Sequence, residues 1–213
     1  MMFNDKYGLT KAVLNGSKRM TRRICKVQRP SDEWRIVFPI IEQLINPECL
    51  PYAYAWRNDK TEEYTDWCVP RYKVGEIVEV AQSYSTVFNE MMQKDSDYDL
   101  YEKFRDYSTH DSKGWSNKMF VRADLMPHQI QITDIRLERL QDISDEDCIA
   151  EGIYKGQCGS IDTHFMDAYY FKGNIQPYCT PRDAYAELID KVSGKGTWES
   201  NPYVYVYEFK VIE

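Results

Sequence analysis

The chain has 213 residues, 43% of them apolar, which is enough for one large domain with a hydrophobic core. Its net charge of −7 argues against a protein that coats duplex DNA or RNA, because such binding relies on many phosphate contacts. The sequence has no apolar run of signal-peptide or membrane-spanning length, so we expect a soluble, cytoplasmic protein without a membrane partner.

The first predicted element is a helix over residues 7–15, with Leu9, Ala12 and Val13 on one face and Gly16 as its stop. It lies within a basic segment, residues 6–31, which contains eight Lys or Arg and no acidic residue. The remaining chain has 19 basic and 34 acidic residues, so the charge is strongly asymmetric. The negative net charge of the whole chain therefore does not exclude the binding of one anionic nucleotide at this basic segment.

The next part of the chain contains few regular patterns. Ser31 is a helix-start signal, so residues 31–46 predict a helix that Pro39 breaks or kinks. Residues 50–73 are rich in Tyr, Trp and Pro and predict irregular structure. Residues 74–82 predict a strand with Val78 and Val80 on one face.

Residues 86–118 are polar and charged and predict a surface insertion, with a short helix at "DLYEKFRDY". Residues 129–140 alternate as a strand, and their apolar phase changes between Ile132 and Ile135. This change predicts a bulge near Thr133-Asp134.

A short helix is predicted within residues 142–153, beginning at Ser144 and ending before Gly152. Residues 153–180 predict another irregular insertion. Thr180-Pro181 opens a further helix with an apolar face of Ala184, Leu188, Ile189 and Val192, and a turn-rich connector follows it. Residues 203–212, "YVYVYEFKVI", predict the closing strand.

Several separated strands with few helices indicate an α+β fold built on a small barrel-like sheet. We expect a single domain over residues 1–213, with insertions at about 27–70, 84–118 and 154–180. Six scattered cysteines without a CxxC pair, and three scattered histidines, predict reduced, mostly buried thiols and no metal site. Motifs for binding dinucleotides or a P-loop phosphate are missing, and we expect no cofactor.

Lys18 and Thr21 lie just beyond the first predicted helix, three residues apart, so a turn there can bring them to one face. A Thr hydroxyl needs a base to become a nucleophile, and a Lys near other cations has a lowered pKa and can act as that base. Arg19, Arg22 and Arg23 supply such cations. The alternative is that these basic residues form a solvated surface.

Glu151 precedes the helix-stopping Gly152. The carboxyl-terminal end of a helix is electrically negative, so a carboxylate there is disfavoured by about 0.3–1 kcal/mol and is ready to accept or share a proton. The alternative is an ordinary exposed glutamate at a helix boundary.

The segment "GSKRMTRR", with its G-x-K-x-x-T-x-R spacing, resembles the signature of the ASCH family within the PUA-like barrels. "YKVGEIVEV" resembles the family's Gly-acidic strand, which follows a cysteine-bearing loop, here that of Cys68. "QITDIRLERLQDISDEDCIAEGI" and "TWESNPYVYVYEFKVI" resemble segments of long, phage-encoded members. The resemblance implies a PUA-like mixed β-barrel of five or six strands, with peripheral helices and long insertions.

A class of small bacterial ASCH enzymes hydrolyses the acetyl amide of N4-acetylcytidine, and the resemblance carries its proposed catalytic Lys, Thr and Glu onto Lys18, Thr21 and Glu151. It assigns Arg23 to an anion or base contact, and we expect Arg19 and Arg22 to join it in binding substrate. Two departures are Val74-Gly75-Glu76, where members often have PGD, and Ala81-Gln82, where they have Arg-Glu.

Two hypotheses follow. The first is an amidohydrolase on an acylated pyrimidine nucleoside, with Lys18 as base, Thr21 as nucleophile or water-orienting hydroxyl, and Glu151 as proton carrier. The second is a non-catalytic module of phage origin that binds RNA or a nucleotide through aromatic stacking and a basic floor. The expected partner is a modified nucleoside or single-stranded RNA.

Overall fold

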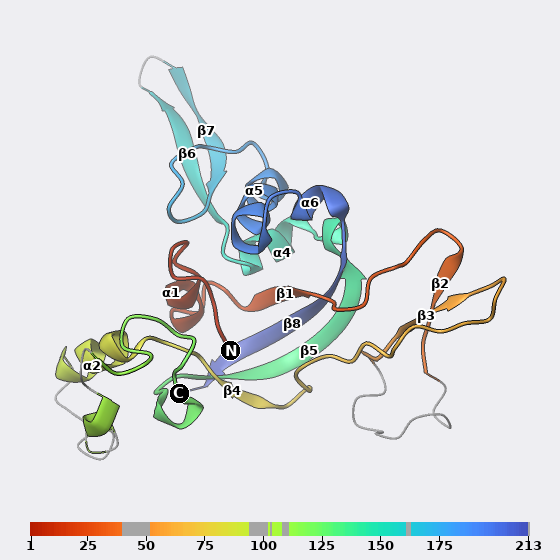
Figure 1. Cartoon of the computed structure of the whole chain (residues 1–213). Coiled ribbons are helices and arrows are strands. Elements are labelled where there is room, and N and C mark those ends of the chain that lie inside the picture. The colour runs from red at the N-terminus through yellow and green to blue at the C-terminus, as the bar shows by residue number, and fades with distance from the viewer. Residues whose placement is uncertain (40–51, 94–101, 103, 108–110, 161–162, 213) are drawn as a thin grey trace.

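The computed structural model describes residues 1–39, 52–93, 102, 104–107, 111–160 and 163–212 (Figure 1). Its main sheet has four antiparallel strands in the order β1-β8-β5-β4, namely Met20–Ile24, Tyr203–Ile212, Gln129–Arg139 and Ile77–Glu79. The prediction that residues 74–82, 129–140 and 203–212 contribute to one sheet is therefore confirmed. The alternation of these segments accounts for the result, because it places one row of apolar side chains on the core.

The predicted bulge in β5 is also confirmed. The pairing of β5 with β8 shifts register between Ile132 and Asp134, which leaves Thr133 as the extra residue. Ile130, Ile132 and Ile135 are all buried, although they occupy even and then odd positions. One extra residue returns the apolar side chains to the core after the phase change.

The structure contains helices where they were predicted within residues 7–15 and 142–153 and after Thr180, and two further helices, over residues 84–93 and 197–200, that were not predicted. These helices are α1 (Leu9–Leu14), α2 (Tyr84–Gln93), α4 (Asp145–Ala150), α5 (Pro181–Ser193) and α6 (Thr197–Ser200), with 3-10 turns at Arg105–Tyr107, Ala123–Leu125 and Leu140–Asp142. Ser144 caps α4 and Thr180 caps α5, each accepting from a backbone N–H three residues on. Figure 1 shows α4, α5 and α6 together on one side of the curved strands β5 and β8.

The helix predicted from residue 31 is wrong over the described residues. Trp34–Val37 form β2, which pairs antiparallel with β3, Ala55–Asn58, inside the region predicted to be irregular. Long-range pairing prevails over the local start signal at Ser31, since "WRIV" is rich in strand-favouring residues. Residues 40–46 of that predicted helix lie outside the described residues.

The irregular insertion predicted for residues 153–180 is instead largely a β-hairpin. Tyr154–Ser160 (β6) pair antiparallel with Thr163–Tyr170 (β7), and the hairpin projects from the body of the molecule (Figure 1). Most of its described side chains are exposed on both faces, so no apolar alternation marks it in the sequence.

The insertion predicted for residues 86–118 has a small core of its own, in which Tyr84, Val87 and Phe104 pack with Leu125 and Met126. Within "DLYEKFRDY", residues 99–101 and 103 lie outside the described residues, and Arg105–Tyr107 form a 3-10 turn.

The α+β class with few helices is confirmed, and every sheet among the described residues is antiparallel. The prediction of a mixed sheet is therefore wrong for this part of the chain. Among the described residues, β1 and β4 are the two edge strands of the main sheet and do not pair with each other. No closed barrel is therefore identified in this part of the chain. No described helix has both the length and the apolar character that crossing a membrane requires.

Candidate functional site

Lys18 lies in the short connection between α1 and β1, which backbone hydrogen bonds hold on both sides. Gly16, at φ 76°, ends α1, and the Lys18 N–H donates to the carbonyl of Ala12 at 2.8 Å. The Arg19 N–H donates to Ala150 of α4, and its carbonyl accepts from Phe209 of β8. The Lys18 side chain is consequently fixed in the interior, where the residue is only 1% exposed.

The Lys18 ammonium meets Glu151 at the end of α4. Its Nζ lies 2.5 Å from the Glu151 Oε2 and also donates to the Glu151 backbone carbonyl at 2.7 Å. Glu151 is 4% exposed, so this is a buried ion pair. The two residues are 133 positions apart in the sequence.

Arg22 binds the second oxygen of the same carboxylate. Its Nη1 lies 3.3 Å from the Glu151 Oε1, and its Nη2 lies 2.6 Å from both Asp147 and Glu138. Arg136 extends the network by binding Glu138 and Asp147. The Arg22 guanidinium is thus surrounded by three carboxylates, which hold its charge and position within the protein.

Burial is the main influence on the charge of Lys18. It lowers the pKa of the Lys18 ammonium, Glu151 opposes this shift, and Arg23 and Arg22 add to it. The predicted lowering of this pKa agrees in direction, but removal from water is a larger cause than the neighbouring cations. A lysine of lowered pKa in contact with a carboxylate can share its proton with that carboxylate.

Thr21 and the ion pair share a cavity of about 300 Å³ at the β1 edge of the sheet. Lys18, Thr21, Arg22, Arg23 and Glu151 all line it. Thr21 is 5% exposed, and among the described residues its hydroxyl is hydrogen-bonded neither to Lys18 nor to Glu151. The structure therefore brings the five residues to one cavity.

Arg19 and Arg23 differ in position. Arg19 is exposed and is not among the residues that line this cavity. Arg23 lines it and donates from Nη2 to the Met2 carbonyl at 2.6 Å. Their different positions follow from β1, since Arg23 lies within that strand and Arg19 precedes it.

Tyr185 of α5 also lines the cavity and was missed by the sequence analysis. It is 2% exposed, and its hydroxyl has no hydrogen-bond partner among the described residues. Burial, reinforced by Glu151, raises the pKa of Tyr185 well above its usual value, so the phenol stays protonated and can donate. Helical spacing is a signal that could have found it, because Tyr185 lies three and four residues before Leu188 and Ile189.

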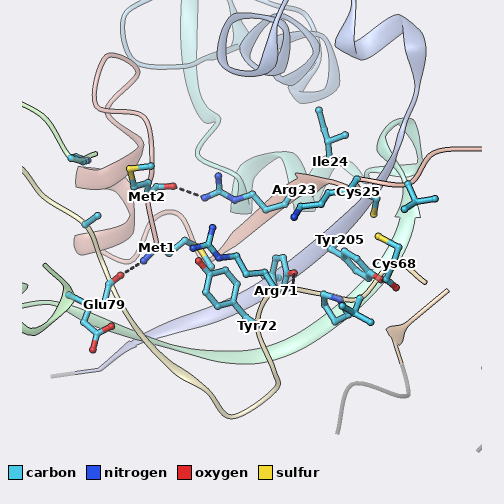
Figure 2. A pocket seen from close by; sticks show the side chains of 18 of the residues that line it. Met1, Met2, Arg23, Ile24, Cys25, Cys68, Arg71, Tyr72, Glu79 and Tyr205 are labelled. Atoms are coloured by element: carbon cyan, nitrogen blue, oxygen red, sulfur yellow. Dashed lines mark hydrogen bonds between the residues drawn. The ribbon is translucent and has the colours of Figure 1, made fainter. Parts of the chain in front are cut away.

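A larger cavity of about 1,020 Å³ adjoins the first and shares Met2, Arg23 and Ile24 with it. Figure 2 shows Arg23 and Ile24 of β1 on one side of it, with Arg71, Tyr72 and Tyr205 on the other. Cys25 and Cys68 line it as free thiols. The two cavities are therefore neighbours at the β1 edge of the sheet.

Within the described part of the chain, no group of three or more His, Cys, Asp or Glu side chains is arranged to hold a metal ion. Searches against protein-family models, curated proteins and solved structures find no match to this chain.

Proposed function

We propose that this chain is an ASCH-type amidohydrolase that acts on an acylated pyrimidine nucleoside such as N4-acetylcytidine. The observation that carries the proposal is the buried Lys18–Glu151 pair in the wall of a cavity that Thr21 also lines. In this proposal the curved four-stranded sheet is the arc of a PUA-like barrel. The molecule is then a cytoplasmic enzyme, as the sequence resemblance implies.

The chemistry needs a nucleophile, a base and a proton donor for the leaving amine, because an uncharged amide is unreactive. Thr21 Oγ1, or a water that it orients, attacks the acyl carbonyl carbon while Lys18 accepts the proton. Lys18 can accept a proton when its own has passed to Glu151 along their 2.5 Å contact, a transfer that burial favours.

Collapse of the tetrahedral adduct breaks the bond to the N4 nitrogen, which takes up a proton relayed through Glu151. If Thr21 is the nucleophile, a water then hydrolyses the acyl-threonine and releases the carboxylic acid. The unpartnered Tyr185 hydroxyl is suited to donate to the carbonyl oxygen as negative charge develops on it.

Cavity size supports a small ligand. A volume of about 300 Å³ is at the lower end of the range for small-molecule sites. It accommodates the pyrimidine and its acyl group, and the sugar extends toward the shared residues Met2, Arg23 and Ile24.

The second candidate is a module that binds a nucleotide or single-stranded RNA without chemistry. The contacts of Lys18 favour it, because both the carboxylate and the backbone carbonyl of Glu151 stabilise the protonated ammonium. In this case the same cavity would recognise a modified base and leave it intact.

The test is acetate release from N4-acetylcytidine by the purified protein, followed by chromatography. We expect Lys18→Ala, Thr21→Ala and Glu151→Gln each to remove most of the rate, non-additively, because the three act as a unit. Lys18→Ala also leaves the buried Glu151 carboxylate without its lysine, which costs about 3–5 kcal/mol of stability.

Thr21→Val is the decisive variant, because it keeps the side-chain volume and removes the hydroxyl to which the proposal assigns the attack on the acyl carbon. Lys191→Ala, which alters an exposed lysine of α5, is the matched control for Lys18→Ala and should retain full rate. Binding of N4-acetylcytidine without turnover by the wild-type protein would favour the binding module instead.

A further inference from the structure

The larger cavity contains two arginines that are placed differently from Arg22. Arg23 and Arg71 both line it, lie close enough for their charges to interact, and extend toward its Met1–Met2 end (Figure 2). Two positive groups of this kind repel each other. An anion bound between or beside them would offset this repulsion.

The existing contacts of both guanidiniums leave donors free for such an anion. Arg23 donates from Nη2 to the Met2 carbonyl at 2.6 Å, and the Arg71 guanidinium lies 5.5 Å from the centre of the Tyr72 ring. Among the residues that the structure describes, neither has a carboxylate within ion-pair distance, whereas the neighbouring Arg22 has three. Planar guanidiniums match the oxygens of a phosphate with two parallel hydrogen bonds.

The rest of the cavity favours a phosphate attached to a nucleoside over a free ion. Of the tyrosines that line it, Tyr205 and Tyr207 are almost fully buried, so the partly exposed Tyr72 is the ring that can contact a sugar or a second base. Arg23 belongs to both cavities, so a base in the smaller cavity places its phosphate at Arg23 and Arg71.

We propose that Arg23 and Arg71 form a phosphate subsite, and that the ligand of this protein is a pyrimidine nucleotide, free or within a single strand, instead of a bare nucleoside. The subsite stands on the two arginines and the larger cavity. The assignment of the base to the smaller cavity rests on the proposed function.

The test compares binding of cytidine, cytidine 5′-monophosphate, N4-acetylcytidine and a five-residue cytidine oligonucleotide by calorimetry. We expect the monophosphate to bind the wild-type protein at least about tenfold more tightly than cytidine, since charge-assisted hydrogen bonds contribute that much. This preference should shrink as salt rises. If the oligonucleotide binds more tightly than the monophosphate, the ligand is a single strand. If the two bind with equal affinity, the ligand is a free nucleotide.

Arg71→Gln should reduce the ratio of monophosphate to cytidine affinity to near one. Lys195→Gln removes the same charge from an exposed position outside both cavities and should keep the wild-type ratio. Arg71 is itself exposed, so its replacement tests the subsite without removing core packing.

The outcomes separate the two proposals. If N4-acetylcytidine is hydrolysed but the monophosphate binds no more tightly than cytidine, the phosphate subsite is refuted and the amidohydrolase stands. If the monophosphate is preferred through Arg71 but no acylated substrate is turned over, the subsite stands and the amidohydrolase fails. Equal loss of the ratio in Arg71→Gln and Lys195→Gln would also refute the subsite, because general charge would then explain it.

Discussion

Lys18 and Arg22 share the Glu151 carboxylate, yet their surroundings prepare them for different tasks. Arg22 also binds Glu138 and Asp147, so its charge is balanced within the protein. The Lys18 Nζ has Glu151 alone as a described ion-pair partner, and burial lowers its pKa. In the proposed reaction, proton exchange is therefore assigned to Lys18 and Glu151, while Arg22 holds Glu151 in position.

Tyr185 provides a prediction at the level of one atom. Tyr185→Phe removes a buried hydroxyl that has no described partner, so we expect the free energy of unfolding to stay constant or rise by up to about 1 kcal/mol. Turnover of N4-acetylcytidine should fall by about tenfold or more, because the donor to the carbonyl oxygen is lost. Urea denaturation and the chromatographic assay measure the two effects separately.

Tyr207→Phe is the matched control for that change. The Tyr207 hydroxyl accepts a hydrogen bond from the Arg71 backbone N–H at 2.9 Å, so its loss should destabilise the protein by about 1 kcal/mol. If Tyr185→Phe destabilises as much as Tyr207→Phe, the Tyr185 hydroxyl has a structural partner and is not available to substrate.

The short helix α4 explains how carboxylates reach the site. Ser144 accepts from the Asp147 N–H at 3.1 Å and fixes the first turn, which sets the rotation of the helix. Asp147 and Glu151 are four residues apart and therefore lie on one face, where both contact Arg22. A helix of six residues is enough to place two of the network's carboxylates.

Gly152 ends α4 and gives a prediction for this element. Its φ of +107° is strained for any other residue, and an added Cβ would lie 3.2 Å from Leu9 Cδ2 and 3.8 Å from Lys18 Cδ. We expect Gly152→Ala to lower the free energy of unfolding by about 1–3 kcal/mol and also to reduce turnover, because relief of the backbone strain and of the tight contact with Leu9 shifts the adjacent Glu151. Urea denaturation and the same assay provide the measurements.

Gly194→Ala isolates the backbone contribution. Gly194 follows α5 at a similar φ of +114°, and an added Cβ there meets no atom within 4 Å. It should destabilise through strain while the rate is retained. Equal rates for the two variants would show that the end of α4 does not position the site.

At the scale of the whole molecule, the main core lies between the sheet and its covering helices, and the β6–β7 hairpin extends beyond it (Figure 1). Gln157 and Asp167 are paired across the hairpin, and the described side chains between them are largely exposed. The base of the hairpin is anchored by Ala168 and Phe171, which are almost fully buried. Stability should therefore depend on the base and not on the tip.

Replacing residues 158–166 with Asn-Gly, which forms a two-residue hairpin turn, should shift the thermal midpoint by no more than about 4 °C. Phe171→Ala, at the buried base, should instead cost about 3–5 kcal/mol. Calorimetry measures the thermal midpoint of each variant and so shows whether stability depends on the base or on the tip of the hairpin. A large loss from the shortened hairpin would show that its tip contributes to the fold.

Local patterns in the sequence were sufficient for the elements that carry a periodic or capping signal. The strands β4, β5 and β8, the bulge after Ile132 and the caps at Ser144 and Thr180 were all predicted correctly. Each depends on residues within a few positions of one another, so the information is complete in a short window. The β2–β3 pair and the β6–β7 hairpin were missed, because cross-strand partners stabilise them and no one-sided burial marks them.

By itself, the sequence determined which residue types are present for the candidate site. These are Lys18 and Thr21, which lie in a basic segment, and Glu151, which lies at a predicted helix end. Tertiary structure alone decided that the Lys18 Nζ lies 2.5 Å from the Glu151 carboxylate and that Arg22 forms ion pairs with three carboxylates. It also decided that Tyr185 lines the same cavity. These facts depend on packing α4 and α5 against the edge of β1, which unites residues more than a hundred positions apart. No local pattern encodes such a contact, because the burial that lowers the pKa of Lys18 exists only after the core has formed.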